Sequence, residues 1–141
     1  MHAMFASAIG SPVSQRQAGA YRQMHVAAGV DNASPHGLIS MLFDGLIGAL
    51  AEARGAMRSG NIAAKGRAIG RAVSIVDDGL RAPLNLTDGG ALAADLHALY
   101  CYIALRLTHA NLHNDEAALD ECARLVEPLR GAWSQIADRA A

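Results

Sequence analysis

The chain has 141 residues, of which 52% are apolar and 18% are charged. A chain of this length makes one domain with a sizeable core, and this composition is typical of a globular protein rather than a disordered one. Twelve basic and thirteen acidic residues leave a net charge of −1, which removes the electrostatic basis for nonspecific binding to nucleic acid or to an anionic membrane.

The first thirty residues carry no long periodic pattern. Residues 1–15 contain glycine, proline and serine, so we expect a flexible tail. This start lacks a positively charged region, and no run in the chain approaches the ~18 apolar residues of a membrane span, so we expect a cytosolic protein. Residues 16–30 would form a short helical cap with Tyr21 and Met24 on one side, which must dock on the domain or stay mobile because so short a helix is marginal alone.

The first long helix is predicted over about residues 35–58. Ser34 followed by Pro35 is typical of a helix start, because serine caps the first turn and proline there has no N–H to lose. The apolar arc that starts at Leu42 extends to about 140°, whereas a one-sided helix needs only about 100°. This surplus predicts a second contact beyond the core. The residues that carry it are Phe43, Ile47 and Leu50.

Three more helices are predicted over about residues 62–82, 90–112 and 115–138. The helix over residues 62–82 carries a bundle seam with a flank of small residues and Ile75. The helix over residues 90–112 has a core face and, nearly opposite, a strip built mostly of small side chains. The helix over residues 115–138 has a single apolar stripe, and Pro128 should kink it or end it early. The flank consists of Ala64, Ala68, Ala72 and Ile75, and the opposite strip consists of Ala94, Ala98, Cys101, Leu105 and Leu112.

Four helices of about 20 residues with short connections predict an all-α fold, an antiparallel up-and-down four-helix bundle over residues 31–138 with a short extra N-terminal helical segment. We expect Thr87 or Asp88 to start the third helix and Asn114 to start the fourth. Glycines inside the helices each cost about 0.5–1 kcal/mol relative to alanine. Either they allow close backbone approach or the bundle tolerates them. They are Gly45, Gly48, Gly55, Gly66 and Gly70.

Little in the sequence points to catalysis. The Glu-x-x-His pairs of a di-iron site, a glycine-rich phosphate loop and a Gly-x-Ser-x-Gly elbow are all missing from the sequence. His109 and His113 could clamp a metal but have no third ligand on the same face, so we predict no metal or other cofactor. Asp44 is better explained by an interhelical hydrogen bond or salt bridge, and Cys101 and Cys122 by burial in a reducing compartment. We therefore expect a protein that is not an enzyme.

Four groups of residues occur in a characteristic order and spacing. They are Tyr21, Val26 and Ala33-Ser-Pro-His with Leu38 to Gly45; Lys65-Gly66, Ala72 and Ile75-Val-Asp-Asp-Gly-Leu80; Gly89-Gly90, Leu99-Tyr-Cys-Tyr102, Arg106-Leu107, Ala110-Asn111 and Asn114-Asp115; and Leu125, Leu129-Arg and Ala132-Trp133. Over roughly residues 16–138, this pattern resembles the flagellin-specific export chaperones, the FliS family. Each motif is weak by itself, and together they are specific.

The resemblance implies a cytosolic chaperone that binds the disordered C-terminal segment of flagellin, keeps it monomeric and delivers it to the flagellar type III export gate. Whether an anti-sigma factor or another flagellar regulator shares the site stays open. A client that folds into amphipathic helices needs apolar grooves, which we expect on the first three long helices and the N-terminal cap, where the family pattern places a tyrosine. The expected client-binding residues are Tyr21, Met24, Phe43, Ile47, Leu50, Ala68, Ile75, Ala94, Ala98, Cys101, Tyr102 and Leu105.

Two other interpretations stay open. A generic helical interaction module could use its second apolar strips to bury a homodimer or to bind another helical partner. A metal-dependent enzyme built on a helical bundle is the other alternative.

Overall fold

The computed structural model describes residues 34–140, with side chains through residue 136. It contains the α-helices α3 (Pro35–Ser59), α4 (Ile62–Ser74), α5 (Gly90–His113) and α6 (Glu116–Ala140), and the π-helix η1 (Ile75–Arg81) that directly continues α4. The expected tail over 1–15 and cap over 16–30, with Tyr21 and Met24, lie outside the described residues.

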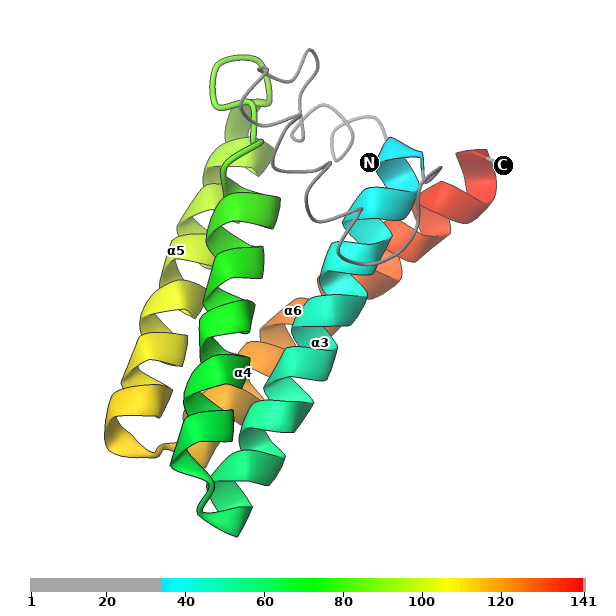
Figure 1. Ribbon diagram of the computed structural model, residues 1–141. Coiled ribbons are helices and arrows are strands. Elements are labelled where there is room, and N and C mark those ends of the chain that lie inside the picture. Colours follow the sequence, from blue (N-terminus) through cyan, green and yellow to red (C-terminus); the bar gives the residue numbers. More distant parts are fainter. Residues whose placement is uncertain (1–33, 141) are drawn as a thin grey trace.

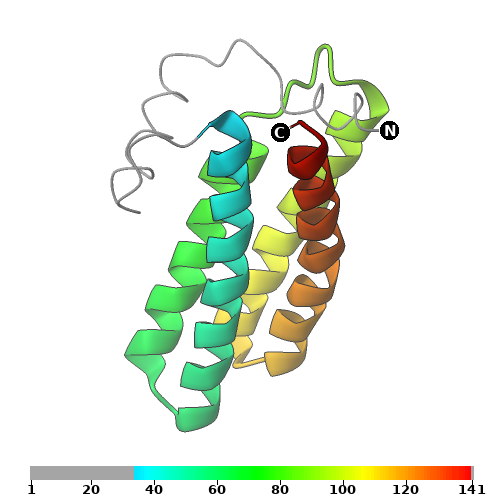
Figure 2. The same cartoon turned by 90° about the vertical axis from the view of Figure 1, so that its right-hand side faces the viewer.

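The helices form one bundle in which consecutive helices run in opposite directions (Figures 1 and 2). Helix α3 packs on α4 and α6, and α5 packs on α4, η1 and α6, so each helix has two neighbours around a shared core. The prediction of an all-α helical bundle is confirmed.

Local side-chain chemistry explains where α3 and α4 begin. The Ser34 hydroxyl accepts a hydrogen bond from the backbone N–H of Gly37 at 3.1 Å, and Pro35 occupies the first turn, as expected. Gly60 ends α3 with a φ of 73°, a left-handed conformation that glycine adopts without strain. The side chain of Asn61 then accepts from the N–H of Ala64 at 3.1 Å and starts α4.

The starts of α5 at Gly90 and of α6 at Glu116 agree with the predicted ranges, but the residues predicted to start these helices are wrong. The Asn85 side chain accepts from the backbone N–H groups of Thr87 and Asp88 at 3.2 and 2.9 Å, so those two residues lie in a turn and do not cap α5. Asn114 has a φ of 55° and ends α5. Asp115 starts α6 instead, because its side chain accepts from the N–H of Ala118 at 3.3 Å. Asparagine tolerates the left-handed conformation well, which makes its role at a helix boundary ambiguous in sequence.

Close approach between α3 and η1 explains one glycine that the sequence did not single out. A Cβ added at Gly79 would lie 3.0 and 3.1 Å from the two terminal methyl carbons of Leu42, which is itself buried. At Gly45 the nearest atom would be the Ile75 Cδ1, 3.4 Å away. A Cβ at Gly55, Gly66 or Gly70 would meet nothing within 4 Å, so close approach does not explain these helical glycines.

Contacts between α3 and α6 close the bundle. The Arg130 Nε donates to the Asp44 Oδ1 at 2.6 Å, which confirms the predicted interhelical role of Asp44. About one turn farther along α6, the indole N–H of Trp133 donates to the backbone carbonyl of His36 in the first turn of α3 at 3.0 Å, and the two rings stack 4.6 Å apart. Pro128 lies inside α6, which continues to Ala140, so the helix does not end early.

Among the described residues, α3 is the one helix whose length and composition would suit a membrane span, with a mean hydropathy of 1.2 over its most apolar window. This differs from the expectation that no run comes near such a length. Many of its apolar residues between Ile39 and Met57 are buried against the other helices. That burial is typical of the core helix of a bundle.

Candidate interaction surface

Helix α5 has two apolar faces, as its sequence predicts. The inner face, with Leu96, Tyr100, Ile103, Leu107 and Ala110, is buried in the core. On the opposite side Leu105 is 70% exposed and Leu112 is 77% exposed. Ala94 and Ala98 are also exposed, and Cys101 is half-buried. We call these five residues, Ala94, Ala98, Cys101, Leu105 and Leu112, the outer strip.

A cluster of three polar side chains borders the outer strip and joins α5 to α6. The Tyr102 hydroxyl donates to the Glu121 Oε2 at 2.8 Å, and the Arg106 Nε donates to the Glu121 Oε1 at 2.7 Å. These two hydrogen bonds, the one from Tyr102 first, lower the pKa of Glu121. The hydrogen bond between Tyr102 and Glu121 also raises the pKa of Tyr102. Tyr102 is 42% exposed, so its ring is held beside the strip while part of it stays accessible.

The predicted site residues on α3, α4 and η1 are mostly not on the surface. Phe43, Leu50, Ala68 and Ile75 are all buried in the core, and Ile47 is half-buried. Phe43, Ile47 and Leu50 therefore do not line an open groove on α3 in the described structure. The physical reason is that α3 packs on both α4 and α6 as well as facing the core, so its wide apolar arc is used within the bundle.

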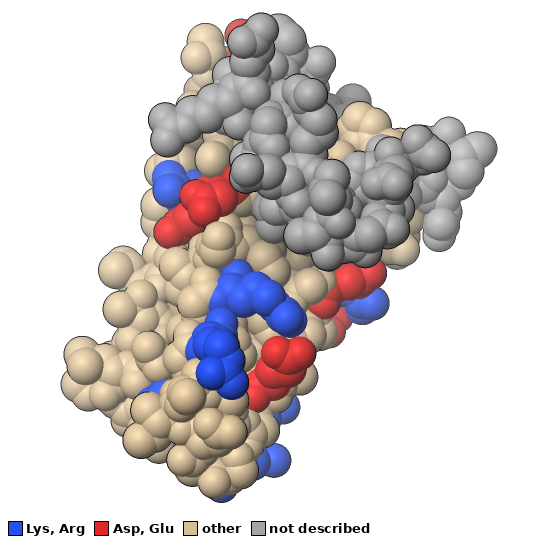
Figure 3. Space-filling view, viewed as in Figure 1, with Lys and Arg blue, Asp and Glu red and all other residues tan. Residues whose placement is uncertain are grey.

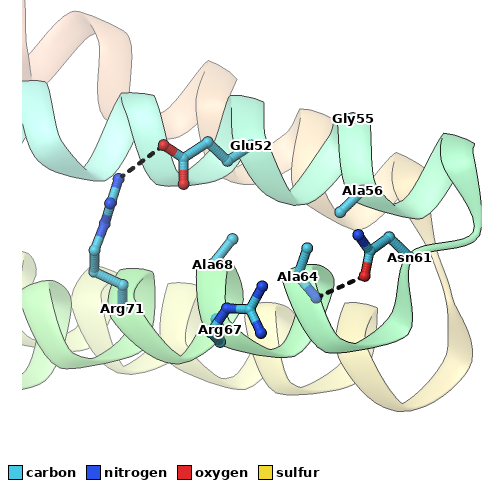
Figure 4. A pocket seen from close by; sticks show the side chains of 8 residues that line it. All are labelled: Glu52, Gly55, Ala56, Asn61, Ala64, Arg67, Ala68 and Arg71. Carbon is cyan, nitrogen blue, oxygen red and sulfur yellow. Dashed lines mark hydrogen bonds and ion pairs between the residues drawn. The ribbon is translucent and has the colours of Figure 1, made fainter.

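A hollow of about 530 Å³ lies between α3 and α4. The small residues that line it are Gly55, Ala56, Ala64 and Ala68, and the polar ones are Glu52, Asn61, Arg67 and Arg71. Arg71 reaches across from α4 to α3, where its Nη2 lies 3.7 Å from the Glu52 Oε1 (Figure 4). We call this feature the α3/α4 groove. Ala64 and Ala68 belong to the predicted flank of small residues, and Ala68 to the expected client-binding residues. Arg67 and Arg71, four residues apart beside them, were not predicted as part of a site.

Comparison with known proteins identifies the family. Residues 17–140 match the family described as flagellar protein FliS. The chain belongs to the FliS family. Among similar proteins, the flagellar secretion chaperone FliS of Salmonella typhimurium is 45% identical over 121 residues, which is 86% of this chain and 90% of that protein. The flagellar secretion chaperone FliSB of Pseudomonas aeruginosa is 42% identical over 116 residues, 82% of this chain and 91% of that protein.

More distant FliS proteins match as well. The flagellar secretion chaperone FliS of Bacillus subtilis is 31% identical over 106 residues, 75% of this chain and 77% of that protein. The resemblance predicted from sequence motifs is confirmed, and an export chaperone is the role that these relatives support. The FliS family implies a role that is not enzymatic.

The polar groups that the sequence marked for possible chemistry have structural partners in this FliS family member. The His109 Nε2 lies 3.2 Å from the Asp115 Oδ2, and the rings of His109 and His113 are 4.5 Å apart. Within residues 34–136, no three histidine, cysteine or acidic side chains are placed to share a metal ion. Burial raises the pKa of the Cys122 thiol to about 11, which keeps it protonated and unreactive at neutral pH.

Proposed function

We propose that this protein is a cytosolic export chaperone that binds the disordered C-terminal region of flagellin. In this proposal it prevents premature polymerisation and delivers the subunit to the flagellar type III export apparatus. The names of its relatives, flagellar secretion chaperones, support the chaperone role. The observation that carries the proposal within the molecule is the outer strip of α5.

The outer strip has the chemistry that an amphipathic client helix requires. Leu105 and Leu112 are seven residues apart, so both project from the same side of α5 two turns apart. Exposed apolar surface of this kind marks interaction sites, and burial of each leucine by a client would contribute about 1.5–3 kcal/mol. Ala94 and Ala98 at the other end of the strip have short side chains, which let a client backbone approach closely. Binding of a helix in an apolar groove would use this arrangement.

Direct client contact is assigned here to the outer strip and Tyr102. Tyr21 and Met24 stay in the proposal as a cap that covers apolar surface in the free protein and rearranges when the client binds. The core residues Phe43, Leu50 and Ile75 would reach the client only if neighbouring elements moved apart, whereas Ala68 lines the α3/α4 groove away from the outer strip. These core residues therefore support the site from within the bundle in this proposal, and half-buried Ile47 lies at its margin.

Polymerisation of flagellin tests the proposal. Monomeric flagellin from the same bacterium would be seeded with filament fragments and its elongation followed by light scattering. An equimolar amount of this protein should suppress elongation, and the variant Leu105→Asp should suppress it far less. Elongation at an unchanged rate with the wild-type protein would contradict the proposal.

The exposed strip also fits a second candidate function, a helical interaction module that buries the strip in a homodimer. A sedimentation series over concentration discriminates between the two. A chaperone should be largely monomeric, or a weak dimer that the flagellin segment displaces, whereas the module should form a dimer that the segment leaves intact. Components of the export gate, and a flagellar regulator such as an anti-sigma factor, are further proposed partners.

A further inference from the structure

The α3/α4 groove has the form of a docking site for an extended structural element. Its lining residues come only from α3, from α4 and from Asn61 in the turn between them. It is therefore a trough between two helices that is partly open to solvent, and not an enclosed pocket. Small-molecule sites bury most of their ligand surface, whereas a trough between two helices suits a third helix.

The charges in the groove are unbalanced. Arg67 and Arg71 lie four residues apart on α4 and face the single carboxylate of Glu52. Within residues 34–136, the guanidinium of Arg67 has no hydrogen-bond or ion-pair partner, and Figure 4 shows it projecting from α4 beside Ala64 and Ala68. Two guanidinium groups against one carboxylate give the groove a net positive charge, and Figure 3 shows basic side chains gathered on this face of the molecule.

The one ion pair in the groove leaves Arg71 available to a partner. Its Nη2–Oε1 distance to Glu52 is 3.7 Å, and the side chains of Arg71 and Glu52 are 51% and 62% exposed. Ion pairs at such exposure are held weakly. An incoming carboxylate can therefore engage Arg71 without breaking a strong contact, and it can engage Arg67 without breaking an ion pair within residues 34–136.

The small residues that line the groove are apolar. Ala56 on α3 and Ala64 and Ala68 on α4 contribute single methyl groups, and a Cβ added at Gly55 would meet nothing within 4 Å. Side chains of a partner can therefore enter the space between α3 and α4. A partner must supply the larger apolar residues itself and place its acids over the arginines.

We propose that the α3/α4 groove docks an amphipathic helix of a partner protein that carries two carboxylates one turn apart, which pair with Arg67 and Arg71. No residue of the outer strip lines this groove. The docking site is therefore separate from the surface assigned to flagellin and goes beyond the proposed function.

The test uses two synthetic helical peptides of ~20 residues, long enough to hold helical structure in water. Both carry the same leucine and alanine face, one with glutamates one turn apart beside it and the other with lysines at the same positions. The full-length protein is titrated with each fluorescein-labelled peptide. The glutamate peptide should bind at least roughly tenfold more tightly than the lysine peptide, and its affinity should fall as salt rises because the charges are exposed.

Variants locate the binding. The double variant Arg67→Glu, Arg71→Glu should reverse the preference toward the lysine peptide, and Arg124→Glu on the exposed side of α6 is a charge-reversal control outside the groove. Gly55→Leu should block both peptides by filling the groove, while its helix keeps its stability because leucine is a better helix former than glycine. Circular dichroism verifies that each variant is folded.

Two outcomes would overturn the inference. One is equal or absent binding of the glutamate and lysine peptides to the wild-type protein. The other is binding that survives both Gly55→Leu and the double reversal. Leu105→Asp, in contrast, should leave glutamate-peptide binding unchanged, so failure at the outer strip and failure at the α3/α4 groove are distinguishable.

Discussion

The ammonium group of Lys65 donates to the backbone carbonyl of Asn111, 3.0 Å away, although Lys65 is only 8% exposed. It also donates to the Asn114 Oδ1 at 3.0 Å. A cation from α4 therefore binds the C-terminal end of α5, where carbonyl groups lack partners within the helix and the helix dipole favours positive charge.

Replacement of this lysine should destabilise the bundle. Lys65→Met keeps most of the apolar stem but leaves the carbonyl of Asn111 without its donor, so we expect a loss of about 1–3 kcal/mol in the free energy of unfolding. Urea denaturation followed by circular dichroism measures it. Arg67→Met, two residues further along α4 at an exposed position, is the control and should change stability by less than about 0.5 kcal/mol. Equal effects of the two variants would contradict the role of Lys65.

The glycines of η1 and α4 should respond in opposite directions to alanine. Gly79→Ala places a methyl group about 3.0 Å from the buried Leu42 side chain, and we expect a net loss of about 1–3 kcal/mol from overpacking. Gly70→Ala meets open space on an exposed face and should gain about 0.5–1 kcal/mol. Thermal unfolding of both variants gives the comparison. A stabilised Gly79→Ala would show that η1 has room to move away from α3.

Two aspartate substitutions on α5 should separate binding from folding. The side chain at position 105 faces water, so Leu105→Asp should leave the fold intact. Flagellin binding should weaken at least about tenfold, because a charge would replace apolar area that the complex buries. Leu107→Asp puts an unpaired charge in the core and should unfold the protein. Leu86→Asp, at an exposed leucine of the loop before α5, is the matched control and should leave both properties unchanged. Unfolding by Leu105→Asp would show that the outer strip is structural.

The hydrogen bonds to Glu121 should contribute to stability in a pH-dependent way. The pKa of Glu121 is lowered in the folded state, so its contribution is present above the ordinary glutamate pKa of about 4.3 and is lost as the pH falls through the lower folded value. Glu121→Gln should therefore flatten the decline of stability between neutral pH and about pH 3. Denaturation at a series of pH values, with Glu127→Gln as control, measures this, and an unchanged acid decline in Glu121→Gln would contradict it.

Helix periodicity made the bundle and the two faces of α5 predictable. Leu105 and Leu107 are two residues apart, which places them on nearly opposite sides of a helix, and the structure exposes one and buries the other. Asp44 could be assigned an interhelical role because a charge on an apolar helix needs a partner, although the sequence could not say that Arg130 supplies it.

The remaining features depend on tertiary packing, which periodicity does not encode. Phe43 and Leu50 belong to an arc whose width the sequence shows, but only the number of helices packed around α3 decides that this arc is buried. The π-helix η1 changes backbone hydrogen bonding, as in the bond from the Ala82 N–H to the Asp77 carbonyl, with no distinct residue signature. The α3/α4 groove is likewise set by the spacing of two helices. The role of Tyr21 stays a prediction.

The most direct test of the central claim is a calorimetric titration of this protein with the C-terminal ~40–50 residues of flagellin from the same bacterium, a segment of the size that folds on binding. We predict tight binding of one segment per chain with a large negative heat-capacity change, because a disordered client buries apolar surface as it folds. The variant Leu105→Asp should bind more weakly with a smaller heat-capacity change. The absence of binding to the wild-type protein would contradict the assignment of a flagellin chaperone.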